Sequence, residues 1–152
     1  YALSIIYKKL YNSSFNKRVS LKEYLYELIQ NISDSYDMNN DSFEIDMAEF
    51  VLDMQDCINI GLIINELITN SIKYSGKVSN ELKLSININI FKNQAISILF
   101  KDNGKGFFDL PKEGSNGLKL IKLLLTKNEG TLNLLNQNGA CIEILYPVKN
   151  GF

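Results

Sequence analysis

The stretch from residue 65 to residue 74 decides the predicted fold, and it reads Asn65-Glu66-Leu67-Ile68-Thr69-Asn70-Ser71-Ile72-Lys73-Tyr74. Glu66 and Asn70 are four residues apart, and Asn70 and Lys73 are three apart, so their polar groups share one stripe of a helix. A carboxylate, an amide oxygen and an ammonium in one row can face a water or hydroxyl, a hard cation and a phosphate, respectively. Alternatively, the same stripe is a solvated helix face with a hydrogen bond between Glu and Asn.

Apolar periodicity and cap signals predict the elements around this stretch. In chain order we expect a helix over 2–11, a helix from the capping box at Ser20 to about Tyr36, a strand over 43–48, the long helix from Asp53 to about Tyr74, a hairpin over 82–100 with its turn at Lys92-Asn93, a helix from Leu118 to about Asn128, and two strands joined at 136–139. This order indicates an α+β fold. We expect a two-layer α/β sandwich with a mixed, mainly antiparallel sheet and its helices on one face.

A second motif, Asp102-Asn103-Gly104-Lys105-Gly106, follows the second strand of the hairpin directly. Two glycines permit a tight turn with unusual dihedral angles and let a planar group approach the backbone. The Asp side chain can accept a hydrogen bond from an exocyclic amine. An Asn-Gly turn without any ligand explains the same residues, so this motif alone is weakly specific.

A third motif, Gly114-Ser115-Asn116-Gly117-Leu118, is a glycine-containing loop that ends where a helix is expected to start. Unpaired backbone N–H groups and the helix dipole make such a junction suitable for phosphate, although many glycine-rich helix starts bind nothing. The sequence has no Gly-x-x-x-x-Gly-Lys-Ser/Thr pattern, which argues against a P-loop.

Length and charge limit the classes of function. The chain has 152 residues, of which 45% are hydrophobic, enough for one well-formed core. Its 16 basic and 17 acidic side chains give a formal net charge of -1, which provides no chain-wide field for nucleic acid or an anionic membrane. Apolar stretches such as 60–64 are interrupted well before the roughly 20 residues that span a bilayer. We therefore expect one domain with no nucleic-acid partner and no membrane contact of its own.

The cysteine and histidine content excludes several chemistries. Cys57 and Cys141 are far apart in apolar surroundings and form no Cys-x-x-Cys pair, so we expect both to be reduced core residues. The chain contains no histidine. His-based metal sites, Ser-His and Cys-His nucleophilic pairs, and phosphorylation of a histidine within this chain are therefore excluded.

Taken together and in this order, the three motifs resemble the N, G1 and G2 boxes of the gyrase, chaperone, histidine kinase and MutL ATPase superfamily. The stretches 61–67 and 117–121 are most similar to sensor histidine kinases whose N box carries Glu. The resemblance covers nearly the whole chain. It implies the Bergerat ATP-binding fold, with 18–150 as the catalytic domain and 1–17 as the tail of the dimerisation and phosphoacceptor helix.

The resemblance implies that the cofactors are ATP and Mg²⁺, with a role for each matching residue. Asn70 is expected to coordinate Mg²⁺, and Glu66 to act as the catalytic base or to orient the metal's water. Asp102 is expected to accept a hydrogen bond from the adenine amino group. The other expected nucleotide contacts are Lys73 at a phosphate, Tyr74 beside the nucleotide, Gly104 and Gly106 around adenine, and Gly114, Gly117 and Leu118 around the phosphates. A mobile lid is expected over 107–116.

Three departures from the family pattern stand out. The phosphoacceptor histidine is absent, so kinase activity requires a histidine outside this chain. Ala140 follows Gly139 where many relatives have Thr, which removes a water-mediated contact to adenine. The expected lid lacks a clear Arg, which leaves Lys105 and Lys112 as phosphate partners or as solvated side chains.

The expected function is therefore transfer of the γ-phosphoryl of Mg-ATP to a histidine on a dimerisation domain of the same parent protein, and onward to a response regulator receiver domain. The parent is expected to be a homodimer, with this chain in the cytoplasm and the parent either soluble or membrane-associated. Three alternatives keep the same fold: an ATP-driven clamp, a serine kinase that phosphorylates an antagonist protein, and a nucleotide-binding regulatory module.

Overall fold

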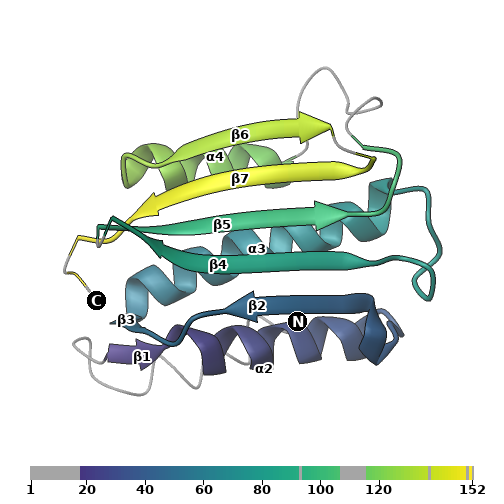
Figure 1. The fold of residues 1–152 in the computed structure, drawn as a ribbon, viewed down its shortest axis with the longest axis horizontal. Coiled ribbons are helices and arrows are strands. Elements are labelled where there is room, and N and C mark those ends of the chain that lie inside the picture. The colour runs from purple at the N-terminus through teal and green to yellow at the C-terminus, as the bar shows by residue number, and fades with distance from the viewer. Residues whose placement is uncertain (1–17, 93, 107–115, 137, 150, 152) are drawn as a thin grey trace.

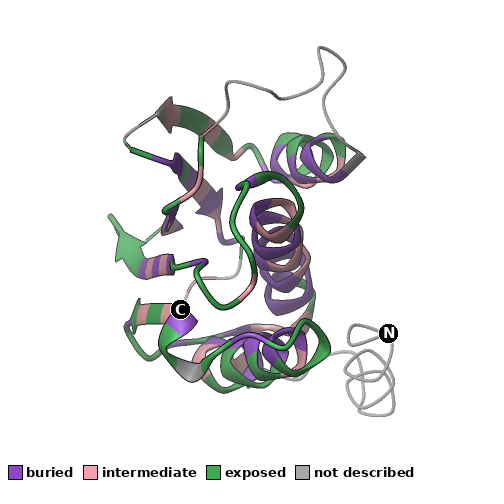
Figure 2. Ribbon diagram, turned by 90° about the vertical axis from the view of Figure 1, so that its right-hand side faces the viewer, coloured by how far each residue is buried: buried purple, intermediate pink, exposed green. Residues whose placement is uncertain are grey.

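The computed structural model describes residues 18–92, 94–106, 116–136, 138–149 and 151. These residues form two layers, a sheet and a layer of helices packed on one of its faces (Figures 1 and 2). The helices are α2 (Leu21–Ser35), α3 (Met54–Tyr74) and α4 (Asn116–Lys127). The predicted α+β sandwich with helices on one face is confirmed.

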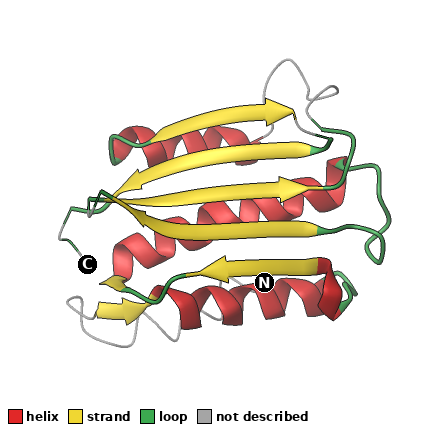
Figure 3. Ribbon diagram, viewed as in Figure 1, coloured by secondary structure: helices red, strands yellow, loops and turns green. Residues whose placement is uncertain are grey.

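The main sheet has five strands in the order β2-β4-β5-β7-β6 (Figure 3). Their bounds are β2 (Phe43–Met47), β4 (Leu84–Phe91), β5 (Ala95–Asp102), β6 (Thr131–Asn136) and β7 (Ala140–Pro147). The β2–β4 pair is parallel, and the pairs β4–β5, β5–β7 and β6–β7 are antiparallel. The sheet is therefore mixed and mainly antiparallel, as predicted.

Strand alternation sends one apolar side chain in two toward the helices. On β5 the inward positions are Ile96, Ile98 and Phe100, all at most 1% exposed, and the next inward position is Asp102. In the register of the sheet, Phe100 is paired with Ile142 on β7. Asp102 therefore continues an apolar row and directs a carboxylate into the space below the helices.

The predicted start of α2 is confirmed, because Ser20 is its N-cap and the Ser20 side chain accepts a hydrogen bond from the Glu23 backbone N–H at 3.2 Å. Asp53 occupies the N-cap position of α3, but its side chain makes no capping hydrogen bond. α2 packs closely against α3 at Gly61, where an added Cβ would lie 2.5 Å from Tyr24 Oη. A glycine in mid-helix is explained by this close approach of the two helices.

A second, two-stranded sheet was not predicted. β1 (Arg18–Ser20) pairs antiparallel with β3 (Val51–Asp53), and the Arg18 guanidinium donates to Val51 O at 2.7 Å. Each strand has three residues, which is too short for an alternating pattern to be recognised. A 3₁₀ turn over Asn40–Ser42 precedes β2.

Residues 1–17, which carry the predicted dimerisation-helix tail, lie outside the described part of the chain. Within the described part, no helix combines the length and the apolar character needed to cross a bilayer.

Candidate functional site

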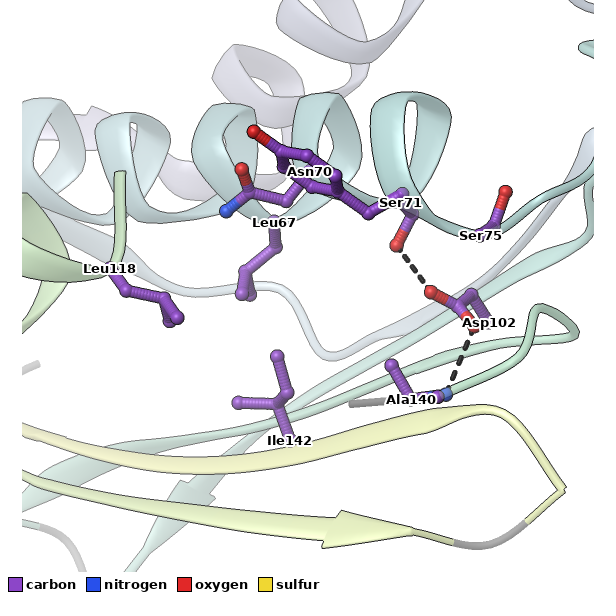
Figure 4. Close-up of a pocket in the computed structure, with 10 residues that line it drawn as sticks. Leu67, Asn70, Ser71, Ser75, Asp102, Leu118, Ala140 and Ile142 are labelled. Atoms are coloured by element: carbon purple, nitrogen blue, oxygen red, sulfur yellow. Dashed lines mark hydrogen bonds between the residues drawn. The ribbon is translucent and has the colours of Figure 1, made fainter. Parts of the chain in front are cut away.

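A pocket lies between the C-terminal half of α3 and the adjacent ends of β5 and β7 (Figure 4). Its lining consists of Leu67, Asn70, Ser71, Tyr74, Ser75, Asp102, Gly106, Leu118, Ala140 and Ile142. In Figure 4 the α3 side chains form one wall and Asp102, Ala140 and Ile142 form the opposite wall, with Leu118 at one end. The pocket is thus apolar in its walls, with a single buried carboxylate.

The α3 wall follows from helical geometry. Leu67, Asn70, Ser71 and Tyr74 are spaced at i, i+3, i+4 and i+7, which places all four on one face. The C-terminal end of that face is fixed to the turn after β5, because Lys105 N donates to Ser75 O at 3.0 Å. One helix therefore contributes an apolar side chain, an amide, a hydroxyl and an aromatic ring to the same pocket.

Asp102 is held by three hydrogen bonds from separate parts of the chain. Its Oδ1 accepts from the backbone N–H of Gly104 at 2.9 Å and of Ala140 at 3.0 Å. Its Oδ2 accepts from the Ser71 hydroxyl at 2.6 Å. With only 9% of the residue exposed, these bonds offset the cost of burying a charge and fix the direction of the carboxylate.

The glycines of the Asp102 motif serve two different purposes. Gly106 has a φ of 77°, the left-handed conformation that the sequence predicted. Gly104 does not belong to the positive-φ residues; instead, a Cβ there would lie 2.6 Å from Ser75 Cα and 2.8 Å from Ser75 O. The expectation of unusual dihedral angles was therefore wrong for Gly104, whose missing side chain permits close packing on the end of α3.

Glu66, Asn70 and Gly117 come together at the N-terminal end of α4. A Cβ on Gly117 would overlap Glu66 Oε2 and lie 3.2 Å from Asn70 Nδ2. The helix dipole makes this end of α4 favourable for an anion. A carboxylate, an amide and a helix N-terminus therefore adjoin one end of the pocket.

The structure brings most of the predicted site residues together. Asn70, Tyr74, Asp102, Gly106 and Leu118 line the pocket. Gly104 lies against the lining residue Ser75, Gly117 lies near the lining residue Asn70, and Glu66 adjoins Gly117. Lys73 is exposed and is not among the lining residues, so its phosphate contact stays a prediction. Gly114, Lys112 and the expected lid fall outside the described residues.

Sequence reasoning did not assign four of the lining residues, which are Leu67, Ser71, Ser75 and Ile142. For Leu67 and Ser71 the signal was available, because both lie on the helix face that also carries Asn70 and Tyr74. Ile142 could not be found in this way. Its position depends on β7 pairing with β5, a contact between segments about forty residues apart.

A buried polar cluster fixes the other end of α3 to the sheet. Tyr146 Oη donates to Asp56 Oδ1 at 2.8 Å and accepts from Asn59 Nδ2 at 2.9 Å, and Gln55 Nε2 donates to Asn59 Oδ1 at 3.1 Å. Burial raises the pKa of Asp56, and the Tyr146 hydroxyl partly opposes that rise. Burial likewise raises the pKa of Tyr146. This cluster sets the position of α3 relative to the sheet, and therefore that of the pocket face.

Comparison with solved structures identifies the fold. The histidine kinase domain of a blue-light activated histidine kinase from Erythrobacter litoralis superposes with a TM-score of 0.80 at 17% identity, covering 97% of this chain and 71% of that one. The Acinetobacter baumannii histidine kinase AdeS gives a TM-score of 0.67 at 22% identity, covering 98% and 75%. The mycobacterial sensor histidine kinase MprB gives 0.66 at 17% identity, covering 88% and 98%.

No family model matches the sequence, and no curated protein matches it either. The structural superpositions therefore carry the conclusion that the chain has the fold of histidine kinase catalytic domains. Because the sequence identities to these structures are low, the likeness shows the fold alone.

Proposed function

We propose that this chain is the ATP-binding catalytic domain of a sensor histidine kinase, which transfers the γ-phosphoryl of Mg-ATP to a histidine outside the chain. The observation that carries the proposal is the Asp102 carboxylate, fixed by three hydrogen bonds in an apolar pocket. The fold of histidine kinase domains supports it.

The pocket has the chemistry that adenine requires. Leu67, Leu118 and Ile142 offer apolar surface to the faces of a planar ring. Asp102 Oδ1 already accepts two hydrogen bonds, whereas Oδ2 accepts only one, so Oδ2 keeps an acceptor position for the exocyclic amine. Tyr74, partly exposed at the rim, would flank the nucleotide.

The Asn70 amide oxygen would hold Mg²⁺ together with the phosphates. Among the described residues, no group of three or more His, Cys, Asp or Glu side chains could hold a metal ion. A single oxygen ligand fits Mg²⁺ nonetheless, because this ion commonly takes one or two protein ligands and completes its shell with phosphate and water. When bound, Mg²⁺ would neutralise phosphate charge as the transition state develops.

Glu66 and the α4 N-terminus would act on the reacting end of the nucleotide. The N-terminal end of α4, at Gly117 and Leu118, would adjoin the phosphate oxygens, and the helix dipole there would favour their negative charge. Glu66, whose Oε2 adjoins Gly117, would accept the proton of the attacking group or orient the metal's water. In the transfer, the bond between the γ-phosphorus and its bridging oxygen breaks, a phosphorus–nitrogen bond forms on the acceptor imidazole, and ADP leaves.

The acceptor must come from another segment or chain, because this chain has no histidine. We propose that a histidine-containing dimerisation domain of the same parent protein supplies it. A response regulator receiver domain would then take the phosphoryl group. The parent would be a homodimer that operates in the cytoplasm.

Calorimetric titration with a non-hydrolysable ATP analogue, with and without Mg²⁺, tests the nucleotide site. We expect a dissociation constant in the micromolar range with Mg²⁺, and strong weakening in Asp102→Ala. The matched control is Asp34→Ala, which removes an exposed carboxylate on α2 that accepts only from Gln30 at 3.1 Å. Equal affinity in wild type and Asp102→Ala would contradict the proposed base contact.

Phosphoryl transfer is tested with γ-labelled ATP and a separately supplied histidine-containing dimerisation domain. The expected product is an acid-labile, base-stable label on the added domain and none on this chain. Acid-stable label on a serine would instead support the serine-kinase alternative. Nucleotide binding without transfer to any acceptor would support a regulatory binding module.

A further inference from the structure

The Ser71 hydroxyl has an unusual hydrogen-bond partner for a hydroxyl in a helix. Ser35, Thr69 and Thr126 each donate to the carbonyl four residues earlier in their own helices, at 2.7 to 2.9 Å, which is the common local bond of helical hydroxyls. Ser71 instead donates across the pocket to Asp102 Oδ2 on β5, at 2.6 Å. Figure 4 shows this bond crossing from one wall of the pocket to the other.

This bond determines what the pocket wall offers to a ligand. The Ser71 proton points at Asp102, so Ser71 Oγ presents only lone pairs to the pocket. Asp102 Oδ1 is occupied by two backbone N–H groups, and Oδ2 keeps one acceptor position. Both residues line the pocket and both are at most 9% exposed. Bulk water therefore has little access to the Ser71 hydroxyl and does not replace Asp102 as its hydrogen-bond acceptor.

We propose that Ser71 is a positioning residue that sets base selectivity: its hydroxyl fixes Asp102 as an acceptor-only wall, which selects a 6-aminopurine over a 6-oxopurine. The inference rests on the proposed nucleotide site and adds the determinant of its specificity. An amino group at C6 places donors against these acceptors, whereas an oxo group places another acceptor against the remaining acceptor position of Asp102 Oδ2 and leaves that position without a donor. Sites built to bond a polar ligand group reject analogues that lack it strongly.

Loss of the hydroxyl should relax this selection. In Ser71→Ala, Oδ2 loses its partner on α3, and the space left by the oxygen admits a water that can donate or accept. A 6-oxopurine can then be bridged to Asp102 through that water. The adenine contact itself survives, because the two backbone bonds still hold Oδ1.

The experiment compares calorimetric affinities for the non-hydrolysable analogues of ATP and inosine triphosphate, which differ at the base. Wild type should prefer the adenine analogue by about 100-fold or more, and Ser71→Ala should reduce that ratio at least about tenfold. Ser71→Thr, which keeps the hydroxyl, should restore the ratio. The matched control is Ser33→Ala, which removes a buried helical hydroxyl that donates to Met38 O at 3.2 Å, away from the pocket.

The outcomes separate this inference from the proposed function. A loss of affinity for both nucleotides at an unchanged ratio would mean that Ser71 has only a structural role, and would overturn the inference. Binding of the adenine analogue with an unchanged ratio in Ser71→Ala would overturn it as well while leaving the nucleotide site intact. Binding of neither analogue by wild type would overturn the proposed function, and the inference with it.

Discussion

Tyr146→Phe removes a single oxygen from the cluster that fixes the N-terminal end of α3. Tyr146 is fully buried, and the ring that remains keeps its packing. The lost hydroxyl was the donor to Asp56 at 2.8 Å and the acceptor from Asn59 at 2.9 Å. Asp56 and Asn59 are 8% and 6% exposed, so water reaches neither group easily. The change in the free energy of unfolding on this substitution therefore reports the contribution of two buried hydrogen bonds.

Each buried group left without a partner costs about 1 to 3 kcal/mol, so we expect the free energy of unfolding to fall by about 2 to 4 kcal/mol. The expected loss is smaller than twice the largest single cost, because Asp56 can take up a proton and so avoid being a buried charge without a hydrogen-bond donor. Urea unfolding followed by circular dichroism measures the change, as a lower midpoint at an unchanged slope. The matched control is Tyr26→Phe, at an exposed tyrosine of α2, which should stay within about 0.5 kcal/mol of wild type. Equal midpoints for the two variants would refute the reasoning.

The pH dependence gives the cluster a second signature. Burial raises the folded-state pKa of Asp56 above its unfolded value, so between the two values the folded state binds more protons. The Asp56 contribution to stability is therefore complete below the unfolded pKa and is lost as the pH rises through the folded pKa. The Tyr146 hydroxyl favours the ionised form, so its removal should cost more at about pH 7 than at about pH 4.5. A pH-independent penalty would show that Asp56 is not the partner that matters.

Three further predictions concern other contacts. Gly61→Ala should lower the free energy of unfolding by about 1 to 2 kcal/mol in urea, because the clash with the buried Tyr24 ring exceeds the helix-propensity gain of about 1 kcal/mol; a more stable variant would contradict this. Gly117→Ala should displace the partly exposed Glu66 carboxylate, because the new Cβ would overlap it. Phosphoryl transfer should slow about 10- to 100-fold, while the free energy of unfolding changes by less than about 1 kcal/mol. An unchanged transfer rate would contradict a role in the reaction for Glu66 at this position. Burial raises the pKa of the Cys57 thiol to about 12, so iodoacetamide at neutral pH should modify it only after unfolding, as mass spectrometry of the peptide would show.

The sequence allowed the main elements and the polarity of the sheet to be predicted because their signals are local. Alternation marked β4 and β5, and the capping box at Ser20 marked the start of α2. The β1–β3 pair was not predicted, because three residues are too few to show the alternation of apolar and polar side chains that marks a strand. The two glycines after Asp102 look alike in sequence, but they are required for different reasons. Gly106 has a positive φ, whereas Gly104 lies so close to Ser75 that a side chain would not fit. Only the first kind of requirement acts within the motif itself.

Ser71 shows how more of the site could have been predicted. Two adjoining stripes run through residues 65–74: one joins Glu66, Asn70 and Lys73, and the other joins Leu67, Ser71 and Tyr74. Asn70 lies at their border and also lines the pocket. Spacing alone cannot choose between them, because the choice depends on how the helix is rotated against the sheet. The rotation is set by the apolar residues that precede the stretch, and the buried row formed by Ile60, Ile64, Leu67 and Ile68 continues to Ser71. A serine on the buried row needs a polar partner, either the carbonyl four residues earlier or a group on the facing layer, and the inward row of β5 supplies one candidate at its end, Asp102. Combining the two rows would thus have made Asp102 a candidate partner of Ser71, beside the local bond to the carbonyl of Leu67.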